Sequence, residues 1–154
     1  MSKEHVLEHL RAAKASHVKW VQRAKKLISG IEIQEEAIPV DSTACEFGTW
    51  FYSDGQKLNA LANNPLESMS KIEQLHFLLH DIYSNIFNIY FNQPKKGFFS
   101  KLFGQKREVS SSEKEVAKEY YQKLESTSTE LLHEINRLER RLLATPEEQM
   151  VNIF

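Results

Sequence analysis

The chain has 154 residues, enough for one domain with its own hydrophobic core, and few glycines or prolines, which favours long helices. Its 20 basic and 21 acidic side chains nearly balance, which excludes the strong positive field typical of nucleic-acid-binding proteins. A single cysteine excludes an internal disulfide framework, no apolar run is long enough to span a bilayer, and the N-terminus lacks an apolar signal region, so we expect a cytoplasmic protein.

The first predicted element is a helix from about Lys3 to Ser29, with Gly30 as its C-cap. Apolar or small residues recur on it at spacings of three and four: Leu10, Ala13, Trp20, Ala24 and Leu27. His17 lies on the same seam, and taken alone it is better explained as a core histidine bonded to a carbonyl. His5 and His9 are also one helical turn apart, but they lie near a terminus and we expect them to be solvated.

The second predicted helix is short. Thr43-Ala44-Cys45-Glu46 has the form of a capping box, which would place Cys45 in the first turn, where the helix dipole stabilises a thiolate. Gly48 follows at a position where a side chain would crowd a neighbouring helix. Asp54-Gly55 predicts that the helix ends or kinks there, before a further helical piece from Gln56 to Leu61.

The third predicted helix runs from Pro65 to about Asn92 and is apolar on almost all sides, which is typical of a central helix or one shared with a partner chain. Its seam has three-four spacing and consists of Met69, Ile72, His76, Leu79, Tyr83, Ile86 and Tyr90. His76 and His80 are one turn apart, so both can face one metal ion.

A different kind of sequence follows in residues 93–112, where basic residues alternate with phenylalanines between Lys95 and Arg107. We interpret it as a solvated linker whose phenylalanines pack against the bundle. The alternative is an arm, residues 95–107, that docks on a partner or on an anionic membrane.

The last predicted helix begins at a second capping box, Ser112-Glu113-Lys114-Glu115, and ends near Thr145, before Pro146. Its seam is formed by Ala117, Tyr120, Leu124, Leu131, Ile135, Leu138 and Leu142, with Ser128 as a polar interruption. His133 lies off this seam and should be exposed. The sequence does not decide whether the tail from Met150 to Phe154 packs or frays.

These elements predict an all-α fold, an antiparallel four-helix bundle with a long connector between the first and second helices and a short, kinked second helix. The bundle would comprise residues 1–145, including the linker 93–112, followed by a tail of residues 146–154. A break at Gly55 would place Cys45 and His76 at the same height, because an unbroken helix to Asn63 would separate them by roughly 10 Å. The connector, if extended, is long enough to return from the end of the first helix to the level of His17.

One thiol and three imidazoles on core-facing positions match the ligands of a tetrahedral zinc site. A histidine pair spaced like His76 and His80 is weak evidence alone, whereas its combination with His17 and Cys45 is much stronger. No glutamate directly follows His76, so the zinc-protease motif is absent. Four protein ligands would also leave no open position for a catalytic water, which disfavours an enzyme.

Three motifs carry a family resemblance: His17-x-x-Trp20, Cys45-x-Phe47-Gly48-x-Trp50-Phe51-Tyr52 and His76-x-x-x-His80. The chain resembles the chemoreceptor zinc-binding (CZB) domain family over roughly residues 5 to 143, including the last helix. The resemblance implies a regulatory zinc site with His17, Cys45, His76 and His80 as ligands and Zn²⁺ as cofactor. It also implies a chemoreceptor or diguanylate cyclase as partner, acting in trans because neither kind of domain is present in this sequence.

Several functions remain open at this stage. The first is a sensor of zinc or of an oxidant such as hypochlorite, in which oxidation of Cys45 weakens one metal bond. The second is an interaction module with a purely structural zinc site. An enzyme is disfavoured, and haem binding through His17 or His76 is a minor alternative. We further expect a symmetric homodimer and no nucleic-acid partner.

Overall fold

The computed structural model describes residues 2–31, 42–62, 66–91 and 109–154. Its elements are α1 (Lys3–Ile28), α2 (Glu46–Phe51), the 3₁₀ helix η2 (Asp54–Ala60), α3 (Leu66–Tyr90), α5 (Ser111–Ala144) and α6 (Glu147–Val151). All regular elements in this part of the chain are helices, which confirms the predicted all-α class. Most of the connector after Gly30 and most of the linker 93–112, including the arm 95–107, lie outside the described residues.

Helix α1 begins and ends with hydrogen bonds that explain its boundaries. The Ser2 hydroxyl accepts from the backbone N–H of His5 at 3.4 Å. At the other end Ser29 is the C-cap, and Gly30 follows it with a φ of 80°. The N–H groups of Gly30 and Ile31 bond back to the carbonyls of Leu27 and Lys26, at 3.2 and 3.0 Å. This Schellman motif needs the left-handed backbone that glycine adopts without strain, so the predicted C-cap glycine lies one position beyond the cap itself.

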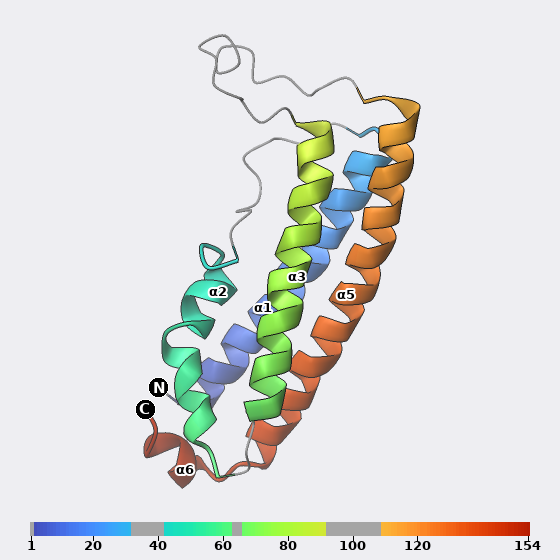
Figure 1. Cartoon of the computed structure of the whole chain (residues 1–154). Helices are drawn as coiled ribbons and strands as arrows, with labels where there is room; N and C mark the ends of the chain where they lie inside the picture. The colour runs from blue at the N-terminus through green and yellow to red at the C-terminus, as the bar shows by residue number, and fades with distance from the viewer. Residues whose placement is uncertain (1, 32–41, 63–65, 92–108) are drawn as a thin grey trace, which may run out of the picture.

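The three long helices lie side by side along a common axis (Figure 1), with α5 running opposite to α1 and α3. Polar contacts fix the antiparallel pairing of α1 and α5. Near the start of α1, Lys3 donates to the carbonyls of Leu143 and Thr145 at 3.2 and 2.6 Å. Further along, Lys14 pairs with Glu139 at 2.5 Å, and this bond holds the pKa of the Glu139 carboxyl below its usual value.

The segment made of α2 and η2 lies beside the lower half of the long helices (Figure 1). As predicted, the second helix is short and broken: α2 ends at Phe51, and the 3₁₀ helix η2, which contains Gly55, follows it. The predicted capping box at Thr43 is wrong, because the N-cap is Cys45 itself. The box of the last helix is also displaced, since Ser110 caps α5 and pairs with Glu113.

The core follows the predicted seams of all three long helices, although Tyr120 is only half-buried. Ser128 is buried at its predicted interruption, and the imidazole of His133 is exposed, as expected. The tail packs rather than frays: Met150 of α6 is fully buried, and Ile153 and Phe154 contact the core.

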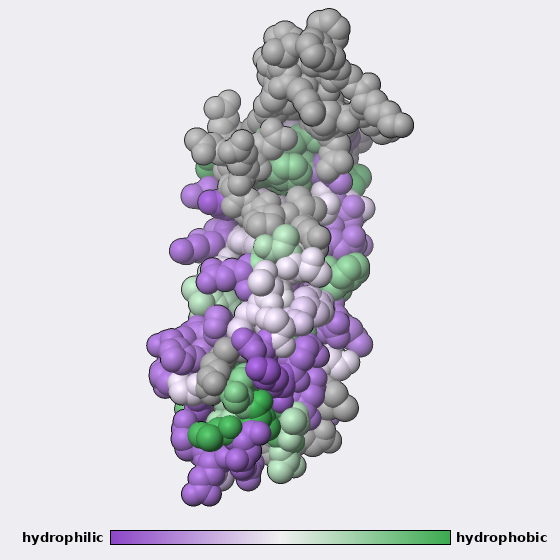
Figure 2. All heavy atoms as spheres, turned by 90° about the vertical axis from the view of Figure 1, so that its left-hand side faces the viewer, coloured by the Kyte–Doolittle hydropathy of each residue, from purple (hydrophilic) through white to green (hydrophobic). Residues whose placement is uncertain are grey.

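The surface of the molecule carries both hydrophilic and hydrophobic residues (Figure 2). On the face where α2 and η2 lie, hydrophilic residues border a band of intermediate hydropathy (Figure 2). The exposed side of α3 is less apolar than predicted, because it also carries Glu73, Gln74 and Asp81, but Phe77 and Leu78 are 62% and 44% exposed. Among the described residues, none of the helices combines the length and the apolar character that crossing a membrane requires.

Candidate metal centre

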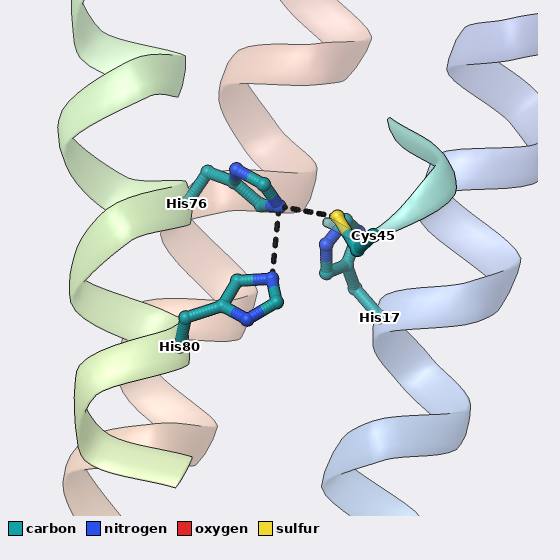
Figure 3. Close-up of side chains that lie close together, drawn as sticks. All are labelled: His17, Cys45, His76 and His80. Carbon is teal, nitrogen blue, oxygen red and sulfur yellow. Dashed lines mark hydrogen bonds between the residues drawn. The ribbon is translucent and has the colours of Figure 1, made fainter. Parts of the chain in front are cut away.

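Four side chains from three helical segments converge in the interior: His17 from α1, Cys45 at the start of α2, and His76 and His80 from α3 (Figure 3). All four are buried, and one ligand atom from each lies within 4.8 Å of the others. In the described part of the chain this is the one group of three or more histidine, cysteine or carboxylate side chains with such geometry. The structure therefore brings together the residues that the sequence singled out.

The spacing within the cluster suits a tetrahedral ion. Zn–N bonds of about 2.05 Å and Zn–S bonds of about 2.3 Å place neighbouring ligand atoms about 3.3 to 3.6 Å apart. The Cys45 sulfur lies 3.3 Å from His76 Nε2, and the latter lies 3.1 Å from His80 Nε2 (Figure 3). These two edges are close to tetrahedral length, so a zinc ion would fit with small adjustments.

The orientation of His17 is set by its own helix. Its Nδ1 donates to the carbonyl oxygen of Ala13 at 2.6 Å. Because a carbonyl can only accept, the proton must be on Nδ1, and Nε2 carries the free lone pair. His17 Nε2 is buried and has no hydrogen-bond partner among the described residues. A buried polar atom without a partner is costly, and a metal ion would remove this cost.

Burial keeps two of the imidazoles in the form that binds metal. Loss of hydration lowers the pKa of His17 to about 4, against a smaller opposing effect of its bond to Ala13. Loss of hydration, reinforced by the neighbouring His17 and His80, lowers the pKa of His76 to about 2. Both side chains are therefore neutral at pH 7, with a lone pair available for coordination.

Cys45 combines two tasks, since it caps α2 and contributes the sulfur to the cluster. Its Sγ accepts the backbone N–H of Gly48 at 3.2 Å and lies 3.4 Å from the Ser42 carbonyl. The turn before α2 passes so close to the helix that a Cβ on Gly48 would lie 1.8 Å from that carbonyl oxygen. The neighbour that Gly48 accommodates is thus this turn and not another helix, as the sequence had suggested.

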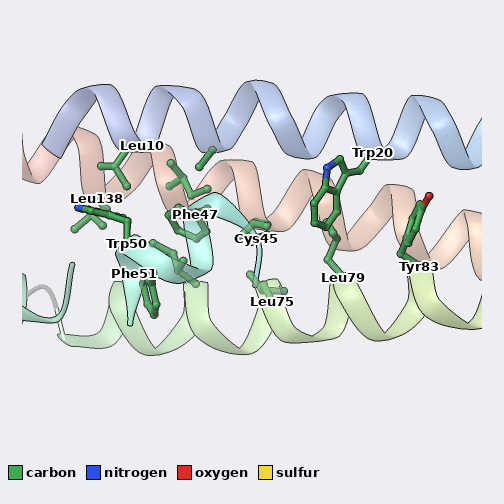
Figure 4. Packing of buried hydrophobic residues seen from close by; sticks show 14 of the residues in the cluster. Leu10, Trp20, Cys45, Phe47, Trp50, Phe51, Leu75, Leu79, Tyr83 and Leu138 are labelled. Atoms are coloured by element: carbon green, nitrogen blue, oxygen red, sulfur yellow. The ribbon is translucent and has the colours of Figure 1, made fainter. Parts of the chain in front are cut away.

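Aromatic rings enclose the cluster. Trp20 stands edge-on to His80, with ring centroids 4.3 Å apart, and Phe47 stands edge-on to His17 and His76, at 5.7 and 5.0 Å. Along the axis Cys45 lies between two apolar layers (Figure 4). One layer contains Leu10, Phe47, Trp50 and Phe51, and the other contains Trp20, Leu79 and Tyr83. Such a dry environment strengthens electrostatic bonds to an ion and keeps water away from the sulfur.

The remaining histidines of the first helix take no part in the cluster. His5 is exposed, as expected, but His9 is not simply solvated: its ring stacks on Trp50 with centroids 4.9 Å apart and an interplanar angle of 10°. The stack was not predicted from the sequence, and the carbonyl bond predicted for His17 was not assigned to Ala13. The Ala13 carbonyl could have been identified from the sequence, because the residue four positions before a helical histidine presents its carbonyl to that side chain.

Residues 17–87 match a family model described as the chemoreceptor zinc-binding domain. The matched range starts at His17, ends in α3 and contains all four residues of the cluster. It is shorter than the resemblance seen in the sequence, which extended to the last helix, so α5 lies outside it. Comparisons with curated proteins and with solved structures gave no match.

Proposed function

We propose that this chain, which carries a chemoreceptor zinc-binding (CZB) domain, binds one zinc ion through His17, Cys45, His76 and His80 and acts as a regulatory protein. The observation that carries the proposal is the buried cluster of three imidazoles and one thiol with its ligand atoms within 4.8 Å. We interpret its frame as an antiparallel four-helix bundle in which α2 and η2 together form one member. With four protein ligands the site would be closed, so we propose no catalytic role.

Metal analysis tests the ligand set. Purified protein should hold one zinc per chain after challenge with a chelator, and Cys45→Ala and His76→Ala proteins should hold almost none. His133→Ala is a matched control, because this exposed histidine of α5 lies outside the cluster. Full zinc retention by the Cys45→Ala or the His76→Ala protein would refute the assignment. An absorbance scan of the same samples tests the haem alternative.

The regulatory signal that we propose is oxidation of Cys45. When bound, zinc holds this sulfur as a thiolate, a soft nucleophile. Attack on hypochlorite transfers two electrons from sulfur to chlorine: R–S⁻ and HOCl yield R–SOH and Cl⁻. A sulfenic acid is a weaker metal ligand and a weaker acceptor for the Gly48 N–H, so both the cluster and the start of α2 would loosen.

Hydrogen exchange tests this switch. After a stoichiometric pulse of hypochlorite, peptides that cover residues 39–50 should lose protection, whereas α3 and α5 should keep theirs, and mass detection should place the oxygen on Cys45. A Cys45→Ser protein treated in the same way is the control for oxidation elsewhere. Complete oxidation of Cys45 without loss of protection in residues 39–50 would exclude the switch and leave the zinc site intact.

A purely structural zinc site is the second candidate, and the complete burial of all four ligands favours it. The same oxidant titration separates the two, since structural zinc would resist concentrations that release zinc from a sensor. The partner of the sensor would be a chemoreceptor or a diguanylate cyclase acting in trans. We also propose a cytoplasmic location, because a reducing compartment keeps the lone thiol available.

A further inference from the structure

A small pocket between α1 and α2 adjoins the cluster. Its volume is about 20 Å³, room for about one water molecule. The residues that line it are His9, Ala12, Ala13, Ser16, Glu46 and Phe47. Four of them come from the face of α1 that α2 covers, and two from the first turn of α2.

The inner wall of the pocket touches two of the four cluster residues. Ala13 accepts the Nδ1–H of His17 at 2.6 Å. The Phe47 ring stands edge-on to both His17 and His76, at interplanar angles of 90° and 89°. Phe47 therefore lies between the pocket and these imidazoles, and a movement of this one ring would join the two spaces.

The outer wall is open to solvent and carries polar side chains beside Ala12. Glu46 and Ser16 are exposed, and His9 is half-buried against Trp50. A carboxylate and an imidazole are both side chains that bind zinc. Two groups that attract the ion thus stand at the mouth of a pocket whose far side adjoins the cluster.

The element that carries Phe47 is suited to local opening. Helix α2 has only six residues, and Cys45 is its N-cap through the bond from Gly48 to Sγ. A helix this short has little stability of its own, so it opens more readily than the long helices around it.

We propose that this pocket is the vestibule through which the cluster exchanges its metal ion with solvent. His9 and Glu46 meet the ion at the mouth, and Phe47 is the gate that moves to admit it. The proposal rests on the zinc-binding function proposed above, and it adds the route and the residues that set the rate of exchange.

A vestibule has a kinetic signature that a structural element lacks. A residue that lies only on the path changes the barrier between the free and bound states and leaves both end states unaltered. The rate constants for zinc uptake and zinc release then change by the same factor, and the dissociation constant stays constant. A residue that supports the ligands would alter the dissociation constant instead.

Ala12→Leu is the test variant, because Ala12 lines the pocket from α1, is exposed and is not one of the four cluster residues. Ala15→Leu makes the same change at an exposed position of α1 outside the pocket. Uptake by metal-free protein is measured by stopped flow with zinc chloride, and release by transfer to a colorimetric chelator. We expect Ala12→Leu to slow both about tenfold, a barrier increase of about 1.4 kcal/mol, and Ala15→Leu to slow neither.

Two further variants sharpen the test. Phe47→Leu should speed both zinc uptake and zinc release, but because Phe47 contacts His17 and His76 the dissociation constant is judged on the pocket-filled protein alone. His9→Asn combined with Glu46→Gln should slow uptake and release by the same factor. If Ala12→Leu fails to fold, Ser16→Leu fills the same pocket from the next turn. Unchanged rates in the pocket-filled protein, or an altered dissociation constant, would overturn the vestibule. If the unaltered protein binds no zinc, the proposed function fails as well, so the two failures are distinguishable.

Discussion

At the scale of single residues, one hydrogen bond reconciles two interpretations of His17 that the sequence left in competition. His17 can be both a core histidine bonded to a carbonyl and a metal ligand, because the hydrogen bond uses Nδ1 and leaves Nε2 to the cluster. The Ala13 carbonyl fixes both the tautomer and the ring orientation, as outer partners of metal-binding histidines usually do. Pre-orientation of this kind lowers the entropy cost of binding an ion.

Substitution of Gly48 should disrupt the site through the backbone. In Gly48→Ala the new Cβ would lie 1.8 Å from the Ser42 carbonyl, so the turn must move and take the Cys45 sulfur with it. We expect a loss of about 2 kcal/mol in the free energy of unfolding and a clear loss of zinc affinity, measured by denaturant titration and chelator competition.

The control for that substitution is Gly30→Ala, at the end of α1. The new Cβ would have no other atom within 4 Å, but alanine strains a backbone with a φ of 80°. The free energy of unfolding should therefore fall by about 1 kcal/mol, and zinc affinity should stay unchanged. Equal zinc affinity in both alanine proteins would contradict the positioning role of Gly48.

The lowered histidine pKa values predict how the stability of metal-free protein depends on pH. An unfolded histidine titrates near 6.5, and the folded pKa of His17 is about 4, so between these values the unfolded state binds more protons. The free energy of unfolding should therefore be highest above about pH 6.5, where His17 is neutral in both states, and should decrease as the pH falls. For His17 alone the loss at pH 4 is about 3 kcal/mol.

Denaturant titrations of metal-free protein at pH 7 and pH 4 measure this loss. His17→Gln should show a smaller decrease than the unaltered protein, since one of the buried titrating groups is gone. His133→Gln removes an exposed histidine and should behave like the unaltered protein. Parallel curves for His17→Gln and the unaltered protein would mean that His17 is not buried in the neutral form.

Two residues of the cluster were predictable because they occupy helical seams, where side-chain direction follows from spacing alone. His17 lies between Ala13 and Trp20 on one seam, and His76 lies on the buried face of α3. The stack of His9 on Trp50 was not predictable, because it depends on how α2 is placed against α1. The cap at Cys45 was missed because the rules for helix ends favour oxygen acceptors, and Thr43 offered one.

At the scale of elements, the start of α5 shows where sequence rules become ambiguous. Residues 110–115 read Ser-Ser-Ser-Glu-Lys-Glu, so a capping box fits both Ser110 with Glu113 and Ser112 with Glu115. The structure uses the first, with the Glu113 N–H donating to the Ser110 hydroxyl at 3.2 Å. The earlier box lengthens the helix by two residues, and nothing in the local sequence opposes that.

Removal of this cap should have a measurable and specific cost. Ser110→Ala deletes the acceptor for the Glu113 N–H, and we expect the free energy of unfolding to fall by about 1 kcal/mol. Ser112→Ala removes a hydroxyl whose contact in this turn is with Ser110. It should lower the free energy of unfolding by a few tenths of a kcal/mol at most. A larger effect at Ser112 would favour the box predicted from the sequence.

The break in the second helix was predictable at this scale for a chemical reason. Cys45 and His76 can meet only if the helical segment after Cys45 is short, and the chain supplies Gly55 at that point. Gly55 is buried, and a Cβ there would lie 3.2 Å from the Trp50 carbonyl, so the tight return after α2 favours glycine.

At the scale of the whole molecule, the arrangement of α1, α3 and α5 follows from three amphipathic patterns, which is why the helical class and the core could be predicted. Contacts that decide the pairing, such as Lys3 with the carbonyls of Leu143 and Thr145, join residues about 140 positions apart and leave no local trace in the sequence. The predicted arm of residues 95–107 lies outside the described residues and stays a prediction.

We propose that the chain forms a homodimer through the exposed side of α3. Phe77 and Leu78 are neighbouring large apolar side chains that are 62% and 44% exposed near the middle of this helix. Single exposed apolar residues are common, but an adjacent pair, here bordered by the polar residues Glu73, Gln74 and Asp81, suits the apolar centre of a two-fold contact, in which the same surface serves both chains.

Sedimentation tests this proposal with a matched pair of variants. Leu78 on α3 and Val116 on α5 are both 44% exposed, so a lysine at either place replaces a similar amount of exposed apolar surface with a charge. We expect the unaltered protein to sediment as a dimer at micromolar concentration, and Leu78→Lys to sediment as a monomer because two buried charges would face each other across the axis. Val116→Lys should remain dimeric. A monomer for the unaltered protein at tens of micromolar, or dissociation of both variants alike, would remove α3 as the dimer surface.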